Sequence, residues 1–339
     1  MFEAISSLLT WNWIWVILNL IFVMLLLNFA TSKLEEELSI IWKKLKISPS
    51  VRWATFDAIS SSLPEFLTAF VWLILLKEKG LEVWIWTISG SAIFNILIIP
   101  FFALLFYKWK WLIKIEKSWI KRDSVFYIIS IIIFLLGLYL NKLFLMWVFL
   151  VILYIFYIYF LYKESQKNKE INKEEIEKSF LEVKDKKISY FTIFYSLVLV
   201  YIWVELAVRD AEFIWESLWI STLVVSLVLL ASITSIPDTL LSIKASQKWD
   251  IDASLSNAVW SNIFDICIWL WFPIIIWIWI MWLSPKVEFS SQIPIFLFLI
   301  FSVFTYLFVL SFKKLNKNSW YLLIWLYSIF IAYLVYISM

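Results

Sequence analysis

The chain has 339 residues, of which 63% are hydrophobic and 16% charged, and its mean hydropathy is +0.88. Soluble domains are about half apolar and about one quarter charged, so this composition excludes a soluble globular protein and indicates lipid as the main solvent. The net charge of +3 does not indicate a nucleic-acid partner, one cysteine excludes a disulfide framework, and the lack of histidine removes the usual transition-metal ligand.

Ten apolar segments are long enough to cross a bilayer, which takes about 20 residues of helix. The first has neither a basic leader nor a small-residue cleavage site, so we interpret it as a retained span and not as a signal peptide. The sequence therefore predicts an all-α membrane protein of ten transmembrane helices, at 11–31, 50–76, 83–107, 124–140, 143–162, 190–208, 217–243, 252–283, 292–312 and 319–338.

One long polar segment, residues 163–189, separates the fifth and sixth predicted spans. It mixes lysines with acidic residues and is typical of a solvated loop, although loops also carry regulatory functions. If this loop is cytoplasmic, both termini lie outside, and basic residues concentrate inside as the positive-inside bias requires. The basic residues that then remain outside are Lys77, Lys79, Lys142, Arg209 and Lys286. We expect a multi-pass protein of the plasma (inner) membrane.

Two short motifs recur in the same order in the two halves of the chain. SSSLPEFLTA (60–69) and GSAIFNIL (90–97) are followed, in the second half, by TSIPDTLLS (234–242) and WSNIFDIC (260–267). Because each half holds an odd number of spans, the second half crosses the membrane upside down relative to the first. Inverted repeats with interrupted helices are typical of secondary transporters. The sequence therefore predicts a first five-helix repeat, a charged cytoplasmic loop and a second, inverted five-helix repeat, at 1–162, 163–189 and 190–339.

Three acidic residues, Glu65, Asp238 and Asp265, lie inside otherwise apolar predicted spans. A carboxylate at the bilayer centre costs about 2.5–3.5 kcal/mol on insertion scales, so an intramembrane acid indicates function. The alternative is a structural ion pair with a buried base, but the spans around Asp238 and Asp265 hold no Arg or Lys near their centres. Pro64 and Pro237 each precede an acid, and the sequence predicts a helix kink at both.

Hydroxyl and amide side chains accompany these acids: Ser61, Ser62, Ser91, Asn95, Thr234, Ser235, Ser261 and Asn262. A lone serine in a membrane helix commonly bonds the carbonyl one turn earlier, but two matching sets beside two matching acids favour a site. An all-oxygen cluster suits a hard cation, Ca²⁺ first and Na⁺ second, whereas Mg²⁺ tends to keep its waters. Closely spaced carboxylates can also hold a proton, so proton coupling stays open.

At these residues the chain resembles the sodium/calcium exchangers of the calcium/cation antiporter superfamily, and most closely their potassium-dependent branch. The segment VRWATFDAISSSLPEFLTA is similar to the first signature of that branch, and GSAIFNIL carries Ala92 where other branches have Asn. The segment from Thr234 to Pro273 resembles the second signature, with Asp where many exchangers have Glu. The vacuolar-type calcium/proton exchangers place their acid in a different motif, so the resemblance favours sodium coupling.

The resemblance also implies ion-site roles. Glu65 and Asp238 would be the central shared carboxylates, with Asn95 and Asp265 completing the ring that holds the metal ion. Ser62 and Ser235 would lie beside them, Ser91 and Ser261 would serve flanking sodium sites, and the backbone carbonyls of Ala58 and Ala231 would contribute there. Asp265 permits potassium co-transport without requiring it, because potassium-independent relatives can also carry Asp at this position.

Two features depart from that family. Arg52 and Asp57 are charges in a segment that the family keeps apolar. Asp57 could add a ligand, but we favour the interpretation that it either pairs with Arg52 or marks a wet helix end. The chain also has 24 Trp and only 3 Gly. Nine tryptophans stand where the resembling family has glycine: Trp53, Trp72, Trp84, Trp86, Trp219, Trp249, Trp260, Trp269 and Trp271. Our hypothesis is that UGA codons read as glycine in the source have been translated as tryptophan; the alternative is a genuinely Trp-rich variant.

The sequence therefore predicts an antiporter that exchanges Na⁺ for Ca²⁺ by alternating access. It would have no cofactor, and its partners would be membrane lipid and inorganic cations, with K⁺ as an optional third ion and a monomer as the simplest state. A calcium/proton or other divalent-cation antiporter is the main alternative, and a channel would differ by a flux that needs no counter-ion. An intramembrane aspartyl protease is disfavoured because no Gly-X-Gly-Asp string occurs.

Overall fold

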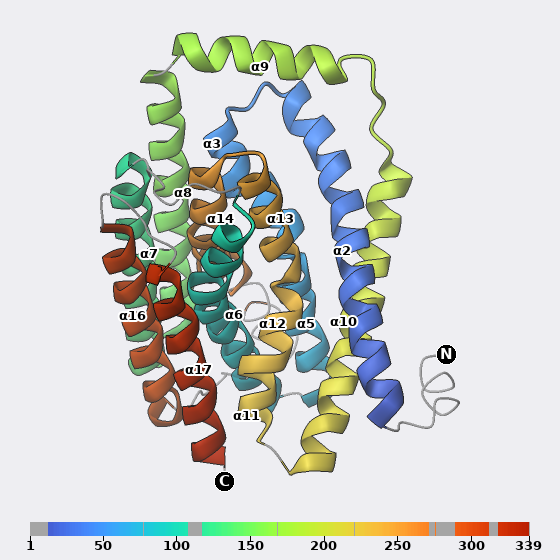
Figure 1. Ribbon diagram of the computed structural model, residues 1–339, viewed down its shortest axis with the longest axis vertical. Coiled ribbons are helices and arrows are strands. Elements are labelled where there is room, and N and C mark those ends of the chain that lie inside the picture. The colour runs from blue at the N-terminus through green and yellow to red at the C-terminus, as the bar shows by residue number, and fades with distance from the viewer. Residues whose placement is uncertain are drawn as a thin grey trace.

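The computed structural model describes residues 13–76, 78–107, 117–167, 169–219, 221–270, 275, 289–311 and 318–338. All elements within these ranges are helices, most of them running along the long axis of the molecule, while α9 lies across one end (Figure 1). The beginning of α2 and the end of α17 both lie at the opposite end from α9 (Figure 1). The described part of the chain is all-helical with apolar helices, which agrees with the all-α part of the predicted fold class.

The first half of the chain consists of α2 (Trp13–Lys44), α3 (Pro49–Arg52), the π-helix η1 (Trp53–Asp57), α4 (Ala58–Ser61), α5 (Leu63–Leu76), α6 (Glu78–Leu105), α7 (Lys117–Tyr139) and α8 (Leu143–Lys167). Helix α9 (Lys169–Val183) connects the halves. The second half consists of α10 (Tyr190–Leu218), α11 (Thr222–Val224), the π-helix η2 (Val225–Leu230), α12 (Ala231–Thr234), α13 (Ile236–Gln247), α14 (Ile251–Phe264), the π-helix η3 (Asp265–Trp269), α16 (Phe289–Ser311) and α17 (Asn318–Ser338).

Each of the ten predicted spans coincides with one helix or with a run of consecutive helices, as far as the described residues reach. Among the residues that the structure describes, six helices qualify as membrane spans by length and hydropathy, or eight if each of the two bent helix pairs counts as one span. The two remaining predicted spans fall on α14 with η3 and on α17, whose apolar part is shorter, Trp320–Tyr336. The structure thus shows six to eight candidate spans, and the ten-span repeat stays a prediction.

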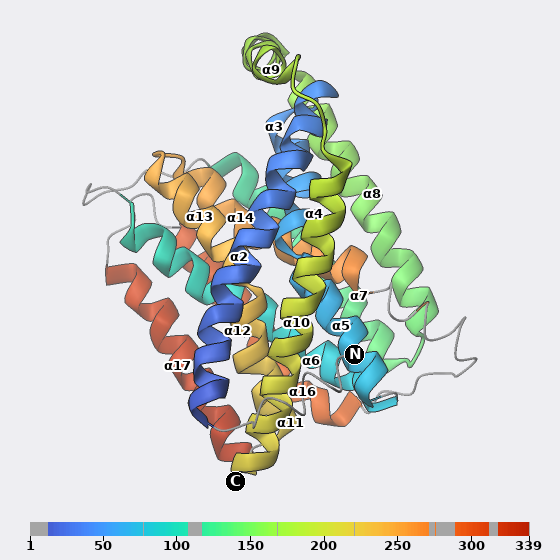
Figure 2. The same cartoon turned by 90° about the vertical axis from the view of Figure 1, so that its right-hand side faces the viewer.

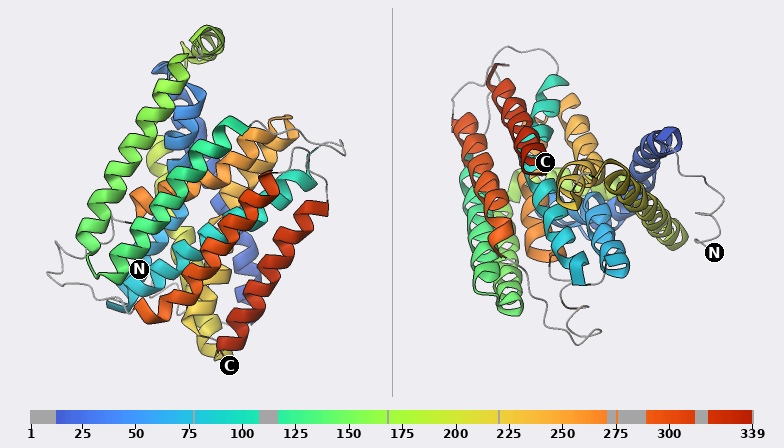
Figure 3. Two further views of the ribbon diagram at one scale, coloured as in Figure 1. Left: turned by 90° about the vertical axis from the view of Figure 1, so that its left-hand side faces the viewer. Right: turned by 90° about the horizontal axis from the view of Figure 1, so that it is seen from below.

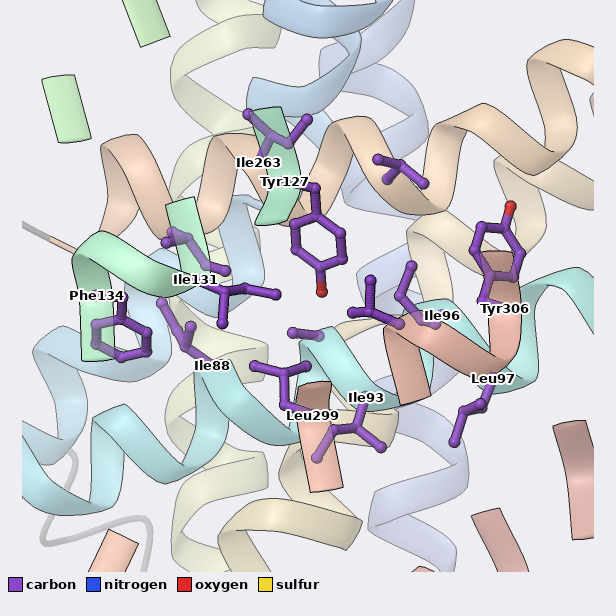
Figure 4. Close-up of a cluster of buried hydrophobic side chains, with 14 of the residues drawn as sticks. Ile88, Ile93, Ile96, Leu97, Tyr127, Ile131, Phe134, Ile263, Leu299 and Tyr306 are labelled. Carbon is purple, nitrogen blue, oxygen red and sulfur yellow. The ribbon is translucent and has the colours of Figure 1, made fainter. Parts of the chain in front are cut away.

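Helix α6 forms the centre of the molecule, with most of its apolar length buried among neighbouring helices. Its isoleucines pack against side chains of α7, α14 and α16, among them Ile131, Ile263 and Leu299 (Figure 4). Helices α2 and α10 lie side by side on one flank (Figure 2), and α16 and α17 lie on the other (Figure 3). Large apolar side chains such as Leu25 and Leu297 are exposed on these outer helices, as expected where the solvent is lipid.

The charged segment between the halves is mostly helical and not an open loop. Helix α9 follows α8 in the chain and is linked by two ion pairs to the end of α2 and the turn after it: Lys43 of α2 and Lys46 just beyond it lie 2.9 Å from Glu182 and Glu177. Lys43 donates a hydrogen bond to Glu182 and lowers the pKa of that carboxyl. Both carboxylates are exposed to solvent, which screens the two ion pairs and leaves them little net stabilisation, so α9 is held loosely over the end of the bundle.

Several tryptophans at suspected glycine positions have a backbone conformation or a hydrogen-bonding state that is unfavourable for tryptophan. Trp219 and Trp249 have φ of 56° and 70°, in the left-handed region that glycine favours. Trp249 ends α13 in a Schellman motif, because its N–H donates to Ser246 and the next N–H donates to the carbonyl of Ala245. Four others bury an indole N–H that has no hydrogen-bond partner: Trp72, Trp84, Trp86 and Trp269. Trp271 lies outside the described residues.

The left-handed backbone supports the hypothesis for Trp219 and Trp249. The unpaired indoles are weaker support, because Trp42 and Trp203, outside the suspected set, also bury an N–H without a hydrogen-bond partner. Trp260 does not support the hypothesis in this way, because its indole N–H donates a 2.7 Å hydrogen bond to Asp123. Mass spectrometry of the protein from its natural source tests the hypothesis directly. We expect glycine masses at Trp219 and Trp249, and indole masses at both would rule it out.

Substituting Trp219→Gly is expected to raise the free energy of unfolding by about 1 kcal/mol, because a left-handed conformation costs an L-residue about 1–2 kcal/mol. The indole is 92% exposed, so its removal gives up almost no burial. Thermal unfolding in detergent measures the change. Asn141→Gly is the matched control: Asn141 also has positive φ but tolerates it, and its gain should be smaller. A lower unfolding midpoint for Trp219→Gly would contradict the prediction.

Candidate ion-binding site

Two interrupted helices bring the predicted site together. The chain leaves helical geometry at Ser62 and at Ser235, where ψ is 8° and 2°, and the helices on either side of these breaks meet at 49° and 43°. The bends confirm the predicted kinks, whose cause is that Pro64 and Pro237 lack the N–H that would continue the helix. Glu65 and Asp238 follow in the first turns of α5 and α13, where the positive end of the helix dipole favours a carboxylate.

Glu65 is fully buried, and its carboxylate accepts hydrogen bonds from hydroxyl groups of both halves of the chain. Ser91 of α6 and Ser235 at the second break each donate to its Oε1 at 3.3 Å. The two hydroxyls also lie 2.8 Å apart. The second carboxylate oxygen, Oε2, accepts no hydrogen bond from the protein, so one side of the Glu65 carboxylate is fixed and the other is left available.

Asp238 has an equivalent environment built with the halves exchanged. Ser261 of α14 donates to its Oδ2 at 2.5 Å and lies 2.9 Å from the hydroxyl of Ser62 at the first break. The backbone carbonyl of Asp238 accepts a hydrogen bond from the amide of Asn257, while Oδ1 accepts none. Each break serine therefore contacts a serine of the other half, which is the relation that two inverted repeats would produce.

A third group links the centres of α6 and α14. The amide of Asn95 donates to Asn262 at 3.0 Å, and Asn262 in turn donates to the carbonyl of Ala92 and to Tyr127. Asp265 begins η3 and lies within electrostatic range of Glu65 and Asp238. Single π-helical turns inside α-helices are frequent at functional sites, and here the turn begins at the third buried carboxylate.

Five buried oxygen atoms of these side chains accept no hydrogen bond from the protein: Glu65 Oε2, Asp238 Oδ1, Asn95 Oδ1, and Asp265 Oδ1 and Oδ2. Buried acceptors, and carboxylates above all, are unfavourable unless they are paired or coordinate a cation. In the described part of the chain, no three carboxylates are close enough to hold a metal ion by themselves. A cation here would therefore take amide and hydroxyl oxygens as well, a mixed set that suits Ca²⁺ or Na⁺.

Four predicted ligands have other partners in this structure. The hydroxyl of Ser61 donates to the carbonyl of Asp57, and that of Thr234 to the carbonyl of Ala231. The carbonyls of Ala58 and Ala231 accept the N–H groups that follow them one turn later, at Ser62 and Ser235. These groups lie next to the helix breaks, and the hydroxyls of Ser61 and Thr234 are also within reach of the carboxylates of Asp238 and Glu65.

Asn257 is the site residue that the sequence analysis missed. Its amide bonds both the carbonyl of Asp238 and the hydroxyl of Ser242, so it fixes α13 against α14. Its position one turn before Ser261 on the same helix could have indicated it. Of the two interpretations favoured for Asp57, the structure shows the pairing with Arg52, with Nε and Oδ2 2.9 Å apart.

Fold and site together define a multi-pass membrane protein whose buried oxygen cluster lies where two interrupted helices meet. The chain belongs to the sodium/calcium exchanger protein family, whose model matches residues 13–163 and 188–339. This match confirms the resemblance found in the sequence. It covers both halves of the chain and leaves out most of the segment that carries α9.

Curated relatives are sodium/potassium/calcium exchangers. Exchanger 2 of Gallus gallus is 34% identical over 112 residues, which are 32% of this chain and 16% of that protein. Exchanger 3 of Homo sapiens is 36% identical over 103 residues, 30% of this chain and 15% of that protein. The chain thus matches only a small part of the length of these relatives, which are transporters by name and not enzymes.

Solved structures share the fold over nearly the whole chain. Native YfkE has a TM-score of 0.73 at 15% identity, covering 98% of this chain and 95% of that one. The H⁺/Ca²⁺ exchanger CAX has a TM-score of 0.69 at 13% identity, covering 95% and 86%. The sodium-calcium exchanger NCX_Mj has a TM-score of 0.61 at 22% identity, covering 94% and 99%.

Proposed function

We propose that this protein is a secondary antiporter that exchanges Na⁺ for Ca²⁺ across a membrane by alternating access. The observation that carries the proposal is the set of five buried oxygen atoms without protein donors at the meeting point of two interrupted helices. Glu65 and Asp238 would share the Ca²⁺, with Asn95 and Asp265 completing its shell. Membership of the sodium/calcium exchanger family and the names of the relatives support the same ions.

Exchange follows from competition for these oxygens. Ser91 and Ser261 each contact a central carboxylate, so sodium ions held by these serines would use acceptors that Ca²⁺ also needs. Binding one set of ions then excludes the other. The remaining proposed ligands, Ser61, Ser62, Thr234, Ser235 and the carbonyls of Ala58 and Ala231, line the two breaks and could turn toward an ion as the helices move.

The topology proposed with this function has ten spans, in two inverted five-helix repeats separated by a charged cytoplasmic segment. Support comes from the matching breaks and from the exchange of serines between the halves. Both termini would then lie outside, since the beginning of α2 and the end of α17 lie opposite α9 (Figure 1). A plasma-membrane location and a monomeric state are part of the proposal.

Calcium-45 uptake into sodium-loaded proteoliposomes tests the function. The protein is prepared with glycine at the nine suspected tryptophan positions, and external K⁺ is present or absent in parallel. We expect uptake that requires the outward sodium gradient, and dependence on K⁺ would assign the potassium-dependent branch. No uptake by folded protein would contradict the proposal.

A Ca²⁺/H⁺ antiporter is the second candidate. Asp265 has two oxygens without protein donors and lies within electrostatic range of two other carboxylates, and such a group can carry a proton in place of sodium. Calcium uptake driven by a pH gradient, and insensitive to sodium, would select this candidate.

A further inference from the structure

A cavity of about 420 Å³ lies between the C-terminal part of α2, Arg52 of α3, η1 and the end of α13, and Lys43 in its lining is paired with Glu182 of α9. The charged side chains that line it come from each of these segments and carry both signs. They are Glu35, Lys43, Arg52, Asp57, Lys244 and Lys248, with Asp250 at the start of α14. Neither the exchanger signatures nor the proposed ion shell assigns a role to these charges.

This cavity leads toward the candidate ion site. A second, smaller cavity shares Glu35, Leu241 and Lys244 with it and is lined on its inner side by Ser60, Ser61 and Pro237. Those inner residues directly precede the break at Ser62 and the carboxylate of Asp238. The two cavities share part of their lining and, if joined, would form one line from the entrance to the helix breaks; the inner one measures about 10 Å³, about the room of a single water, so this line is narrow in this structure.

An ion pair lies along this line. Arg52 Nε is 2.9 Å from Asp57 Oδ2, but it lacks the alignment of a hydrogen bond. In the same position the Arg52 guanidinium lies 4.3 Å from the ring centre of Trp42 and 4.7 Å from that of Trp53, so the two indoles would still hold it near the cavity if it left Asp57. Asp57 itself is only 6% exposed, and a buried carboxylate that loses its partner demands another cation.

Asp57 is also connected to the site through the backbone. Its carbonyl accepts 2.9 Å hydrogen bonds from the hydroxyls of Ser60 and Ser61. Glu35 lies within electrostatic range of Asp57 and lines both cavities. A cation that replaced Arg52 would thus find two carboxylates at the entrance and a direct link to the first helix break.

We propose that Asp57 is the entry carboxylate of the ion passage on the α9 side and that Arg52 is its gate. In the closed pair Arg52 neutralises Asp57 and repels cations; an arriving cation displaces the guanidinium from Asp57, is held by Asp57 and Glu35, and passes on to Glu65 and Asp238. The inference rests on the proposed function for its cargo. It deepens that function by assigning one side of the passage.

Kinetics on each side of the membrane test the gate. In oriented proteoliposomes, Asp57→Asn is expected to raise the KM for Ca²⁺ about tenfold on the α9 side only, because the entry charge is lost. Arg52→Gln should lower the KM on that side, since Asp57 is then open to cations. Glu36→Gln is the matched control, because Glu36 lies beside Glu35 on α2 but is paired outside the cavity with Lys33. Equal KM values for wild type and Asp57→Asn, or equal changes on both sides, would overturn the inference.

A labelling experiment separates this inference from the proposed function, because it needs no transport. Ser39 lines the larger cavity, and the chain's one cysteine, Cys267, is buried. Ser39→Cys in a Cys267→Ser background should react with a membrane-impermeant cationic thiosulfonate from the α9 side, faster with Arg52→Gln and more slowly with Asp57→Asn. This pattern without any calcium uptake would support the passage while refuting calcium exchange. Labelling from the opposite side of the membrane, or labelling rates that neither substitution changes, would refute the passage.

Discussion

Glu65→Gln and Asp238→Asn are each expected to abolish sodium-driven calcium uptake, with a loss of about 100-fold or more in initial rate. Both amides keep the size of the side chain and an oxygen that can accept the existing serine hydroxyls. The substitutions remove the negative charge, whose attraction offsets the free-energy cost of dehydrating a divalent ion in a buried site. A neutral ring of amides and hydroxyls cannot balance Ca²⁺ where water is excluded.

The same substitutions should leave the fold intact or stabilise it. Both carboxylates are fully buried and each has an oxygen without a protein donor, so the empty protein bears the unfavourable burial of charge. We therefore expect an equal or higher midpoint of thermal unfolding together with lost exchange. This combination distinguishes a binding residue from a structural one, for which stability would fall with activity.

Glu216→Gln supplies the matched control, because it removes the same charge at an exposed position near the end of α10. Its uptake rate and unfolding midpoint should equal those of the wild type. Near-normal calcium uptake by either Glu65→Gln or Asp238→Asn would remove that residue from the site, and uptake by both would end the assignment of the central carboxylates.

Local sequence patterns predicted the parts of the fold that depend on local chemistry. Apolar length placed the helices, and a proline beside an acid placed both breaks, because the missing N–H acts within one turn. The span predicted at 50–76 corresponds to the run of helices from Pro49 to Leu76. The pairing of Arg52 with Asp57 was also predictable, since a charged residue buried near an opposite charge is rarely left alone.

Features that depend on contacts between distant segments were not predictable. The pairing of Ser62 with Ser261, and of Ser91 with Ser235, joins the two halves, and no local pattern specifies which serine meets which. Helix α2 continues to Lys44, well beyond the apolar segment, because it packs against η1, α9 and α13 after its hydropathy has fallen. The cavity at Glu35 exists only because of that extension. From the sequence alone, the charged residues that line it cannot be told from ordinary surface residues.

Gly90→Ala is expected to disrupt both the fold and transport, although it adds a single methyl group. A Cβ at Gly90 would lie 2.3 Å from the backbone oxygen of Leu227 and 2.8 Å from its Cα. Backbone atoms cannot rotate away as a side chain can, so α6 and η2 would have to separate. Overpacking of this kind costs about 1–3 kcal/mol, and we expect a lower midpoint of thermal unfolding in detergent.

The functional loss should exceed what the loss of stability alone would cause, because of where the methyl group lies. Ser91 follows Gly90 and holds Ser235 and Glu65 at 2.8 and 3.3 Å, so moving α6 away from η2 pulls apart the contact between the two halves. Ser89→Ala is the matched control: Ser89 is buried on the same helix, but its hydroxyl has no partner, so both uptake and stability should persist. Wild-type exchange by Gly90→Ala would show that the two helices are not held at this distance in the working protein. In that case the serine contacts between the halves could not be what positions Glu65.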